Sequence, residues 1–291
     1  MSSSLFELPT VETLSSSISL RQQDELKLVV IDHPTFRAAF SLQGGQLIAW
    51  QPLEQAPVIW LSDNSAFTQG KAIRGGVPIC WPWFGPAGKP SHGFARTAEW
   101  SLATYEESAQ QVTLSMVLQQ SAETLALWPH DFTLIMLATL SADSCELQLK
   151  IIGDFSSTAA LHSYFHVAQS EKVSVSGLGE TFIDKVRDNA LCSQSEQQTY
   201  HGEVDRIFTD PAVESVIDDP VLGRKLLIAH KGNSDVVTWN PGADLSTSMA
   251  DMCNDGYKTM VCVETARIHQ PFITTKAEPA EISVRITPLT R

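Results

Sequence analysis

The chain has 291 residues, of which 43% are hydrophobic and 18% charged, a composition typical of a globular protein with a sizeable core. Its 20 basic and 33 acidic residues give a net charge of −13, which argues against nucleic acids and anionic membranes as partners because both would repel this surface. No apolar run is long enough for a membrane span.

The first 24 residues are rich in serine and glutamine, and we expect a loose lead-in with room for one short helix. The start of the chain has neither a basic segment nor an apolar core, so a secretory signal is not expected. The five cysteines form no C-x-x-C pair, which favours free thiols in a reducing compartment and therefore a cytoplasmic location.

From residue 25 onward, short apolar runs separated by turn residues predict one large all-β domain that continues to residue 291. The expected strands of the first half are 27–32, 36–42, 46–50, 58–61, 111–118, 132–140 and 145–152. Those of the second half are 173–175, 206–209, 225–229, 236–239, 260–263 and 282–286. Short helices are expected only at 122–127 and 245–253. Many short strands joined by frequent turns indicate an antiparallel β-sandwich or a barrel.

A loop over residues 73–86, continued by 91–96, contains three prolines and three glycines in its first part. These residues prevent a long helix and interrupt any strand. The loop also carries aromatic residues together with Arg74, His92 and Arg96, as a polar small-molecule site requires. A buried structural loop with two surface arginines explains the same composition equally well.

Residues 161–166 are expected to form a strand in which His162, Tyr164 and His166 share one face. From the residues alone, a histidine on a strand is more often structural than catalytic. His162 and His166 would lie ~13 Å apart along the strand, too far to share one metal ion. No P-loop, dinucleotide-binding or H-E-x-x-H motif occurs either, and no metal is expected.

Two carboxylates are further candidates. Glu264 ends an apolar strand, where burial would raise its pKa and make it a usable base near neutral pH. A surface glutamate at a strand end is the commoner alternative. Asp205 precedes Arg206, and the pair could equally form an ion pair at a turn.

Six short motifs, taken together, resemble the hexose-6-phosphate mutarotases (glucose-6-phosphate 1-epimerases), a branch of the aldose 1-epimerase superfamily. They occur in the order found in that family and extend over most of the chain. The motifs are 74–85 (RGGVPICWPWFG), 92–96 (HGFAR), 160–165 (ALHSYF), 204–206 (VDR), 239–241 (WNP) and 261–264 (VCVE).

The resemblance implies a galactose-mutarotase-like β-sandwich, an isomerase activity on aldohexose 6-phosphates, and no cofactor. It implies that His162 and Glu264 are catalytic and that Arg74, His92, Arg96 and Asp205 bind substrate. In this reading Glu264 removes the proton of the anomeric hydroxyl, and protonated His162 donates to the ring oxygen, so that the ring opens and recloses. Arg74 and Arg96 would hold the phosphate, although Arg74 could contact the sugar instead, and Trp83 could lie against the sugar face.

Two other classes of function stay open at this point. A non-catalytic sugar-phosphate sensor on the same fold would keep the arginines but would not need the acid–base pair. A carbohydrate hydrolase or lyase would need two carboxylates, which Asp205 and Glu264 could supply. The sequence does not identify the preferred hexose 6-phosphate, and it leaves the oligomeric state open, with a monomer as one option.

Overall fold

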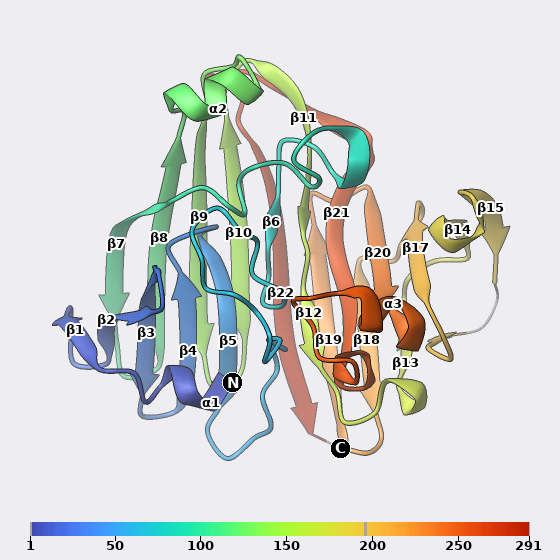
Figure 1. The fold of residues 1–291 in the computed structure, drawn as a ribbon, viewed down its shortest axis with the longest axis horizontal. Helices are drawn as coiled ribbons and strands as arrows, with labels where there is room; N and C mark the ends of the chain where they lie inside the picture. Colours follow the sequence, from blue (N-terminus) through green and yellow to red (C-terminus); the bar gives the residue numbers. More distant parts are fainter. Residues whose placement is uncertain (1, 195–196, 291) are drawn as a thin grey trace.

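The computed structural model describes residues 2–194 and 197–290, which form three antiparallel sheets (Figure 1). The first sheet has five strands that are neighbours in chain order. They are β1 (Thr10–Thr13), β2 (Ile18–Gln23), β3 (Leu26–His33), β4 (Phe36–Ser41) and β5 (Gln46–Pro52).

The second sheet has nine strands, and its order combines distant parts of the chain. From one edge to the other, the strands are β16 (Gln198–Thr199), β13 (Ser174–Ser176), β18 (Glu214–Asp219), β19 (Arg224–Lys231), β22 (Ala280–Thr290), β10 (Cys145–Ile152), β9 (Thr133–Ser141), β8 (Gln111–Gln119) and β7 (Ser101–Glu107).

The third sheet has eight strands. Seven of them follow the order β15 (Ala190–Ser193), β14 (Thr181–Asp184), β17 (Val204–Phe208), β20 (Asp235–Asn240), β21 (Met260–Thr274), β11 (Phe155–Leu161) and β6 (Ile79–Cys80), while β12 (Tyr164–His166) pairs with β21 beyond the end of β11.

Helices are few and short in the described part of the chain. The α-helices are α1 (Ser2–Leu5), α2 (Ala122–Leu127) and α3 (Gly242–Ser248). Single 3₁₀ turns are η1 (Gly85–Ala87), η2 (Ser170–Lys172), η3 (Lys185–Arg187) and η4 (Gly256–Thr259). No helix within residues 2–194 and 197–290 is long and apolar enough to cross a membrane.

The nine-stranded sheet packs its apolar face against the other two sheets, which makes the molecule a β-sandwich. Along β8 and β10 every second residue is buried, as expected for strands with one face toward a core. One apolar cluster contains Val29 of the first sheet, Leu114 and Leu149 of the second, and Val236 and Val263 of the third. In Figure 1, β3–β5 lie over β8–β10. The all-β sandwich expected from the sequence is confirmed.

Four local expectations differ from the structure. The first 24 residues, expected to be loose, contribute α1, β1 and β2. Residues 58–61, expected to be a strand, form only isolated bridges, at Ile59 and Leu61. They lie alongside the loop over 73–76, which is not a regular strand. The second of the two expected helices, predicted over 245–253, is α3. It spans Gly242–Ser248 and ends there because the backbone of Met249 is extended.

The fourth difference concerns the strand expected over 161–166, which is broken. β11 ends at Leu161 and β12 begins at Tyr164, and the Ser163 N–H donates to the Leu161 carbonyl across the break. The division into a lead-in over residues 1–24 and one domain over 25–291 stays a prediction.

Candidate active site

Glu264 and His162 form a buried contact on the third sheet. Glu264 lies in β21 opposite Val237 of β20, and its side chain is 1% exposed. His162 occupies the break between β11 and β12, where its backbone N–H donates to the Pro78 carbonyl at 3.0 Å. The imidazole Nε2 lies 3.3 Å from Oε1 of Glu264. The break in the strand thus brings this imidazole next to the carboxyl.

The glycine- and proline-rich loop runs alongside the same strands and is fixed to them by backbone hydrogen bonds. β6 pairs with β11, and the Tyr164 N–H donates to the Gly76 carbonyl at 2.9 Å. Gly76 has a φ of 73°, and a Cβ there would lie 2.3 Å from the Leu47 carbonyl oxygen, so only glycine fits. This close approach brings the preceding Arg74 to the edge of the site.

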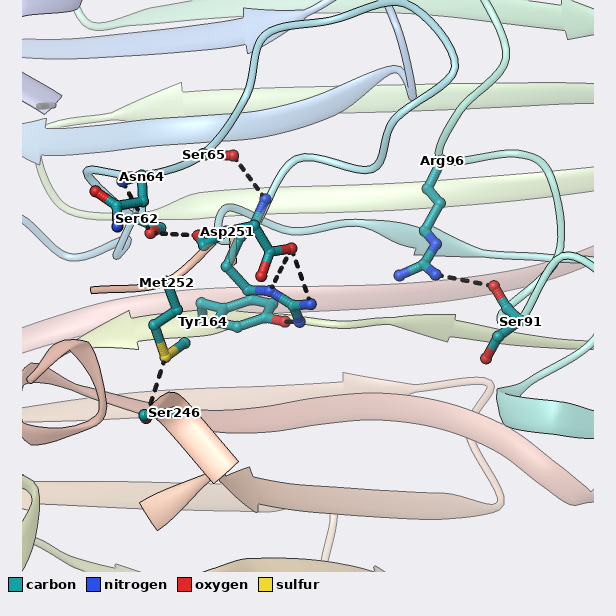
Figure 2. A network of polar contacts seen from close by, with 10 residues as sticks. Ser62, Asn64, Ser65, Ser91, Arg96, Tyr164, Ser246, Asp251 and Met252 are labelled. Carbon is teal, nitrogen blue, oxygen red and sulfur yellow. Dashed lines mark hydrogen bonds and ion pairs between the residues drawn. The ribbon is translucent and has the colours of Figure 1, made fainter. Parts of the chain in front are cut away.

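Arg74 is held by two partners, Asp251 and Tyr164, both of which are labelled in Figure 2. Its Nε and Nη2 lie 3.1 and 3.0 Å from Oδ2 of Asp251, and its Nη1 donates to the Tyr164 hydroxyl at 3.0 Å. Asp251 is itself anchored, since its carbonyl accepts from the Ser62 hydroxyl at 2.7 Å. Three of the five guanidinium N–H groups are therefore used within the protein.

His92 lies against the catalytic candidates from the loop side. Its ring is 5.8 Å from that of His162, centroid to centroid, and 4.8 Å from that of Phe84. The Gly85 N–H donates to Nδ1 of His92 at 3.3 Å, so the proton of the neutral imidazole is on Nε2. Burial, together with Arg96 and Arg74, lowers the pKa of His92 to about 3. His92 therefore offers one neutral N–H donor.

A cavity of about 570 Å³ opens above these residues. Five of the six residues expected from the sequence line it: Arg74, His92, His162, Asp205 and Glu264. The walls are completed by Phe84, Tyr164, Trp239, Leu245 and Met249, among others, and by Lys185 at the β14 side. The sequence pattern and the cavity therefore agree on the location of the site.

Arg96 and His166 are not in the cavity lining. Arg96 donates from Nη2 to the Ser91 carbonyl at 2.8 Å (Figure 2), while its Nε is buried without a partner among the described residues. Its charge still acts on the site, because it lowers the pKa of both Glu264 and His162. His166 packs elsewhere, with its backbone carbonyl bound by Arg224 at 2.7 Å.

Burial favours the uncharged form of both members of the Glu264–His162 pair. It raises the pKa of Glu264 well above the ordinary carboxyl value, with Asp205 acting in the same direction. It lowers the pKa of His162 well below the ordinary imidazole value, with His92, Arg96 and Arg74 adding to the effect. In the neutral pair, the one transferable proton lies on the carboxyl. In the charged pair expected from the sequence, the same proton lies on the imidazole.

The pair also has unused hydrogen-bonding capacity. Oε2 of Glu264 and Nδ1 of His162 are buried and have no partner within the described residues. Buried polar atoms are rarely left without partners, so such atoms next to a cavity indicate a ligand that supplies them. A molecule with adjacent hydroxyl and ether oxygens could bond to both groups and exchange protons with them.

Asp205 faces the cavity from β17. Burial raises its pKa to about 6; the carboxylates Glu203 and Asp184 act in the same direction, and Lys185 opposes them. The carboxylate is therefore mostly ionised at neutral pH and can accept hydrogen bonds from a hydroxylated ligand. Among residues 2–194 and 197–290, no group of three or more His, Cys, Asp or Glu side chains could hold a metal ion.

Several cavity residues were not singled out from the sequence. Tyr164 and Trp239 lie within motifs but had no role assigned, although Trp239 lies edge-on to both His162 and Tyr164. Lys185 had no local signal, and nothing in the sequence pointed to the contact between Arg74 and Asp251, which does not itself line the cavity. Trp83, expected against the sugar, does not line the cavity and instead donates from Nε1 to the Pro90 carbonyl at 2.8 Å.

Comparison with known proteins gives consistent matches over nearly the whole chain. The family model described as aldose 1-epimerase matches residues 27–281. A protein of Escherichia coli (strain K12) named "Putative glucose-6-phosphate 1-epimerase" is 48% identical over 288 residues, which cover 97% of this chain and 97% of that protein.

Solved structures agree with this match. The crystal structure of a "putative mutarotase" from Salmonella typhimurium has a TM-score of 0.97 at 45% identity and covers 99% of each chain. A galactose mutarotase related enzyme from Lactobacillus acidophilus, at 11% identity and a TM-score of 0.68, covers 90% of this chain and 97% of its own. At that identity the second match bears on the fold alone, and it confirms the galactose-mutarotase-like sandwich.

Proposed function

The chain belongs to the aldose 1-epimerase family, and from this premise we propose that it interconverts the α and β anomers of an aldohexose 6-phosphate. The isomerase activity follows from the family. The phosphorylated substrate is supported by the names of relatives such as the E. coli protein and by the basic groups of the cavity lining. The observation that carries the proposal is the buried Glu264–His162 pair with its unpartnered Oε2 and Nδ1.

Anomer exchange requires one group that takes the proton from the anomeric hydroxyl and another that protonates the ring oxygen. In the proposed reaction Glu264 is the base and His162 the acid. A proton first moves from Glu264 to His162 across their 3.3 Å contact, and sugar hydroxyls that bond to the new carboxylate compensate for its burial.

Ring opening then proceeds with balanced proton transfers. Glu264 takes the O1 proton, the C1–O5 bond breaks as the C1=O1 bond forms, and His162 gives its proton to O5. Rotation about C1–C2 and reclosure by the reverse steps yield the other anomer. No redox step occurs, which is why no cofactor is part of the proposal.

The direction of the pKa shifts identifies the costly stage of this sequence. After ring opening, Glu264 is protonated and His162 is neutral, which is the state that burial stabilises. The same protonation state precedes the first proton transfer, so the low-polarity surroundings disfavour only the charged pair between the two. Hydrogen bonds from the sugar that form to this charged pair therefore lower the barrier.

The remaining residues expected from the sequence are proposed as substrate contacts. Arg74 keeps two N–H groups beyond those bound to Asp251 and Tyr164, and we assign these to sugar hydroxyls. His92 donates from Nε2, and Asp205 accepts from a hydroxyl. Arg96 contributes positive charge near Glu264, which assists the ionisation of that carboxyl.

Location and partners complete the proposal. All five cysteines are free, which supports a reducing, cytoplasmic environment. The net charge of −13 supports a small-molecule partner over nucleic acid or an anionic membrane. The oligomeric state is left open.

Product analysis tests the proposal against a hydrolase or a sensor. Freshly dissolved α-glucose 6-phosphate is mixed with the protein, and optical rotation and mass are followed together. An epimerase speeds the change in rotation and leaves the mass unchanged. A change in mass would indicate a hydrolase or lyase, and binding without any acceleration would indicate a sensor.

A further inference from the structure

The imidazole of His162 stacks on the ring of Tyr164, two residues further along the chain. The two ring centroids are 4.8 Å apart, and the planes differ by only 12°. The other ring contacts of His162 are oblique, at interplanar angles of 66° with His92 and 74° with Trp239. Tyr164 therefore covers a face of the imidazole, whereas His92 and Trp239 meet it edge-on.

Hydrogen bonds alone do not fix the orientation of His162. Its Nε2 lies 3.3 Å from Oε1 of Glu264, while its Nδ1 has no partner within the described part of the chain. A ring held at one atom can tilt about that contact, so packing has to fix its plane. The nearly parallel ring of Tyr164 does so, because a tilt of the imidazole would break the stack.

Tyr164 is itself held firmly. It is 2% exposed, and its ring also stacks on Trp60, with centroids 5.9 Å apart and planes 18° apart. Its hydroxyl accepts a hydrogen bond from Nη1 of Arg74 at 3.0 Å (Figure 2). Trp60 is anchored in turn, since its Nε1 donates to Oγ1 of Thr259 at 3.1 Å. A side chain locked in this way can hold a neighbouring catalytic group in place.

The face of Tyr164 also suits the charge that His162 acquires in the proposed reaction. The face of an aromatic ring attracts a cation within about 6 Å, and the attraction is stronger where water is excluded. Tyr164 and His162 are 2% and 8% exposed, so their contact is largely dry. The stack therefore favours the imidazolium form of His162.

The charged and titratable groups around His162 act in different directions. Burial lowers its pKa, and three groups of the loop act in the same direction: His92, Arg96 and Arg74. Glu264 of β21 favours the imidazolium once it is ionised. Tyr164 of β12 stays uncharged, because burial raises the pKa of its phenol. Its ring thus stabilises the imidazolium whether or not Glu264 is ionised.

We propose that Tyr164 is a positioning residue, which holds the His162 ring against Glu264 and stabilises its protonated form through the stacked aromatic face. The assignment rests on the proposed function and deepens it, since it explains how a buried imidazole carries the proton that O5 receives. The phenol hydroxyl takes no part in proton transfer, and its hydrogen bond with Arg74 keeps the ring in place.

The first test compares Tyr164→Phe, which keeps the aromatic face, with Tyr164→Leu, which removes it. Tyr164→Leu should lower kcat for glucose 6-phosphate by about 10- to 30-fold, the effect of one desolvated cation–π contact, with a smaller change in KM. Tyr164→Phe should retain most of kcat. Tyr200→Phe is the matched control and should equal the wild type, because Tyr200 is 3% exposed, bonds through its hydroxyl to Thr238, and does not line the cavity.

The pH dependence of kcat separates this role from a purely structural one. On the acid side, the rate falls when His162 gains a proton while Glu264 still holds its own. Without the aromatic face His162 is harder to protonate, so the acid limb of Tyr164→Leu should move to lower pH and the alkaline limb should stay in place. Loss of packing alone would lower kcat at every pH and move neither limb.

Fluorinated phenylalanines at position 164 keep the proposal testable even if Tyr164→Leu does not fold. Ring fluorines withdraw electron density from the aromatic face and change its shape little. Relative to Tyr164→Phe, kcat and the midpoint of the acid limb should fall step by step as one, two and three fluorines are added. Values that do not depend on fluorination would overturn the proposal, as would a Tyr164→Phe variant that loses kcat by 10-fold or more, about the loss predicted for removal of the face.

An NMR titration of the His162 imidazole without substrate distinguishes failure of this inference from failure of the proposed function. The signal is assigned with His162→Asn, and its titration midpoint should fall along the same fluorine series. If the wild-type protein exchanges no anomers, the proposed function is wrong, and these midpoints still decide the role of Tyr164. Rapid exchange by the wild type, with rates and midpoints that ignore the fluorines, would overturn the role of Tyr164 and leave the epimerase activity in place.

Discussion

Replacing Glu264 by glutamine tests the proposed base with the smallest change in shape. The side chain is 1% exposed and touches His162, so the amide fills the same space but cannot carry a proton between O1 and the enzyme. A positioned proton-transfer group contributes about 10²-fold or more to turnover, equivalent to ~2.7 kcal/mol of barrier. We expect Glu264→Gln to lower kcat for glucose 6-phosphate by at least that factor.

The same substitution has a predicted effect on stability. Burial raises the folded-state pKa of Glu264, so this group stabilises the fold fully below the ordinary carboxyl pKa of 4.5, and the contribution is lost as pH rises toward the folded-state value. Glutamine does not titrate. The free energy of unfolding of Glu264→Gln should therefore increase relative to wild type as pH is raised from about 5 to 9.

Two measurements test the expected effects of Glu264→Gln on rate and on stability. Exchange between the α and β anomeric proton signals in NMR gives the rate, and denaturant unfolding followed by circular dichroism gives stability. Glu12→Gln, at an exposed position of β1, is the control and should match the wild type in both. A folded Glu264→Gln protein with near wild-type exchange would refute the role of Glu264, and Asp205, with its pKa of about 6, would become the next candidate base.

Three further predictions follow from the site. His162→Asn should also lower the rate of anomer exchange by about 10²-fold. The double variant with Glu264→Gln should lose little more activity than either single variant, because the two groups act as a unit. Fully additive losses would contradict the pairing. A plot of kcat against pH should be a broad bell. At low pH the Glu264–His162 pair gains a second proton, and at high pH it loses its only transferable proton, and either change stops exchange. A rate that climbs steadily with pH would contradict this prediction. Iodoacetamide should leave exchange unaffected, because burial raises the pKa of Cys80 to about 12 and shields the buried Cys262; rapid inactivation with label on either thiol would contradict this.

Local sequence patterns predicted the elements whose signals are themselves local. α2 was expected over 122–127 and lies there, because Ser121 and Thr124 form a reciprocal capping box. β8 and β10 were recognised by their alternation of apolar and polar residues. β14 and β18 were missed because short, partly polar strands are stabilised mainly by their neighbours in the sheet.

The site was only partly predictable for the same reason. The six expected residues came from motifs, and five of them line one cavity. Lys185 could not be found this way, since its position depends on the pairing of β14 with β17. The Arg74–Asp251 contact joins residues 177 positions apart, so no local pattern shows that this guanidinium is already paired.

The central claim, anomer exchange of a phosphorylated hexose by an acid–base pair, is tested most directly by one NMR experiment on the wild-type protein. The rate of α–β exchange is measured for glucose 6-phosphate and for glucose at equal concentrations, with Glu264→Gln as the inactive reference. We predict rapid exchange of glucose 6-phosphate, slower exchange of glucose, and rates close to the uncatalysed reaction for the variant. Exchange of glucose 6-phosphate no faster with the wild type than without protein would contradict the account.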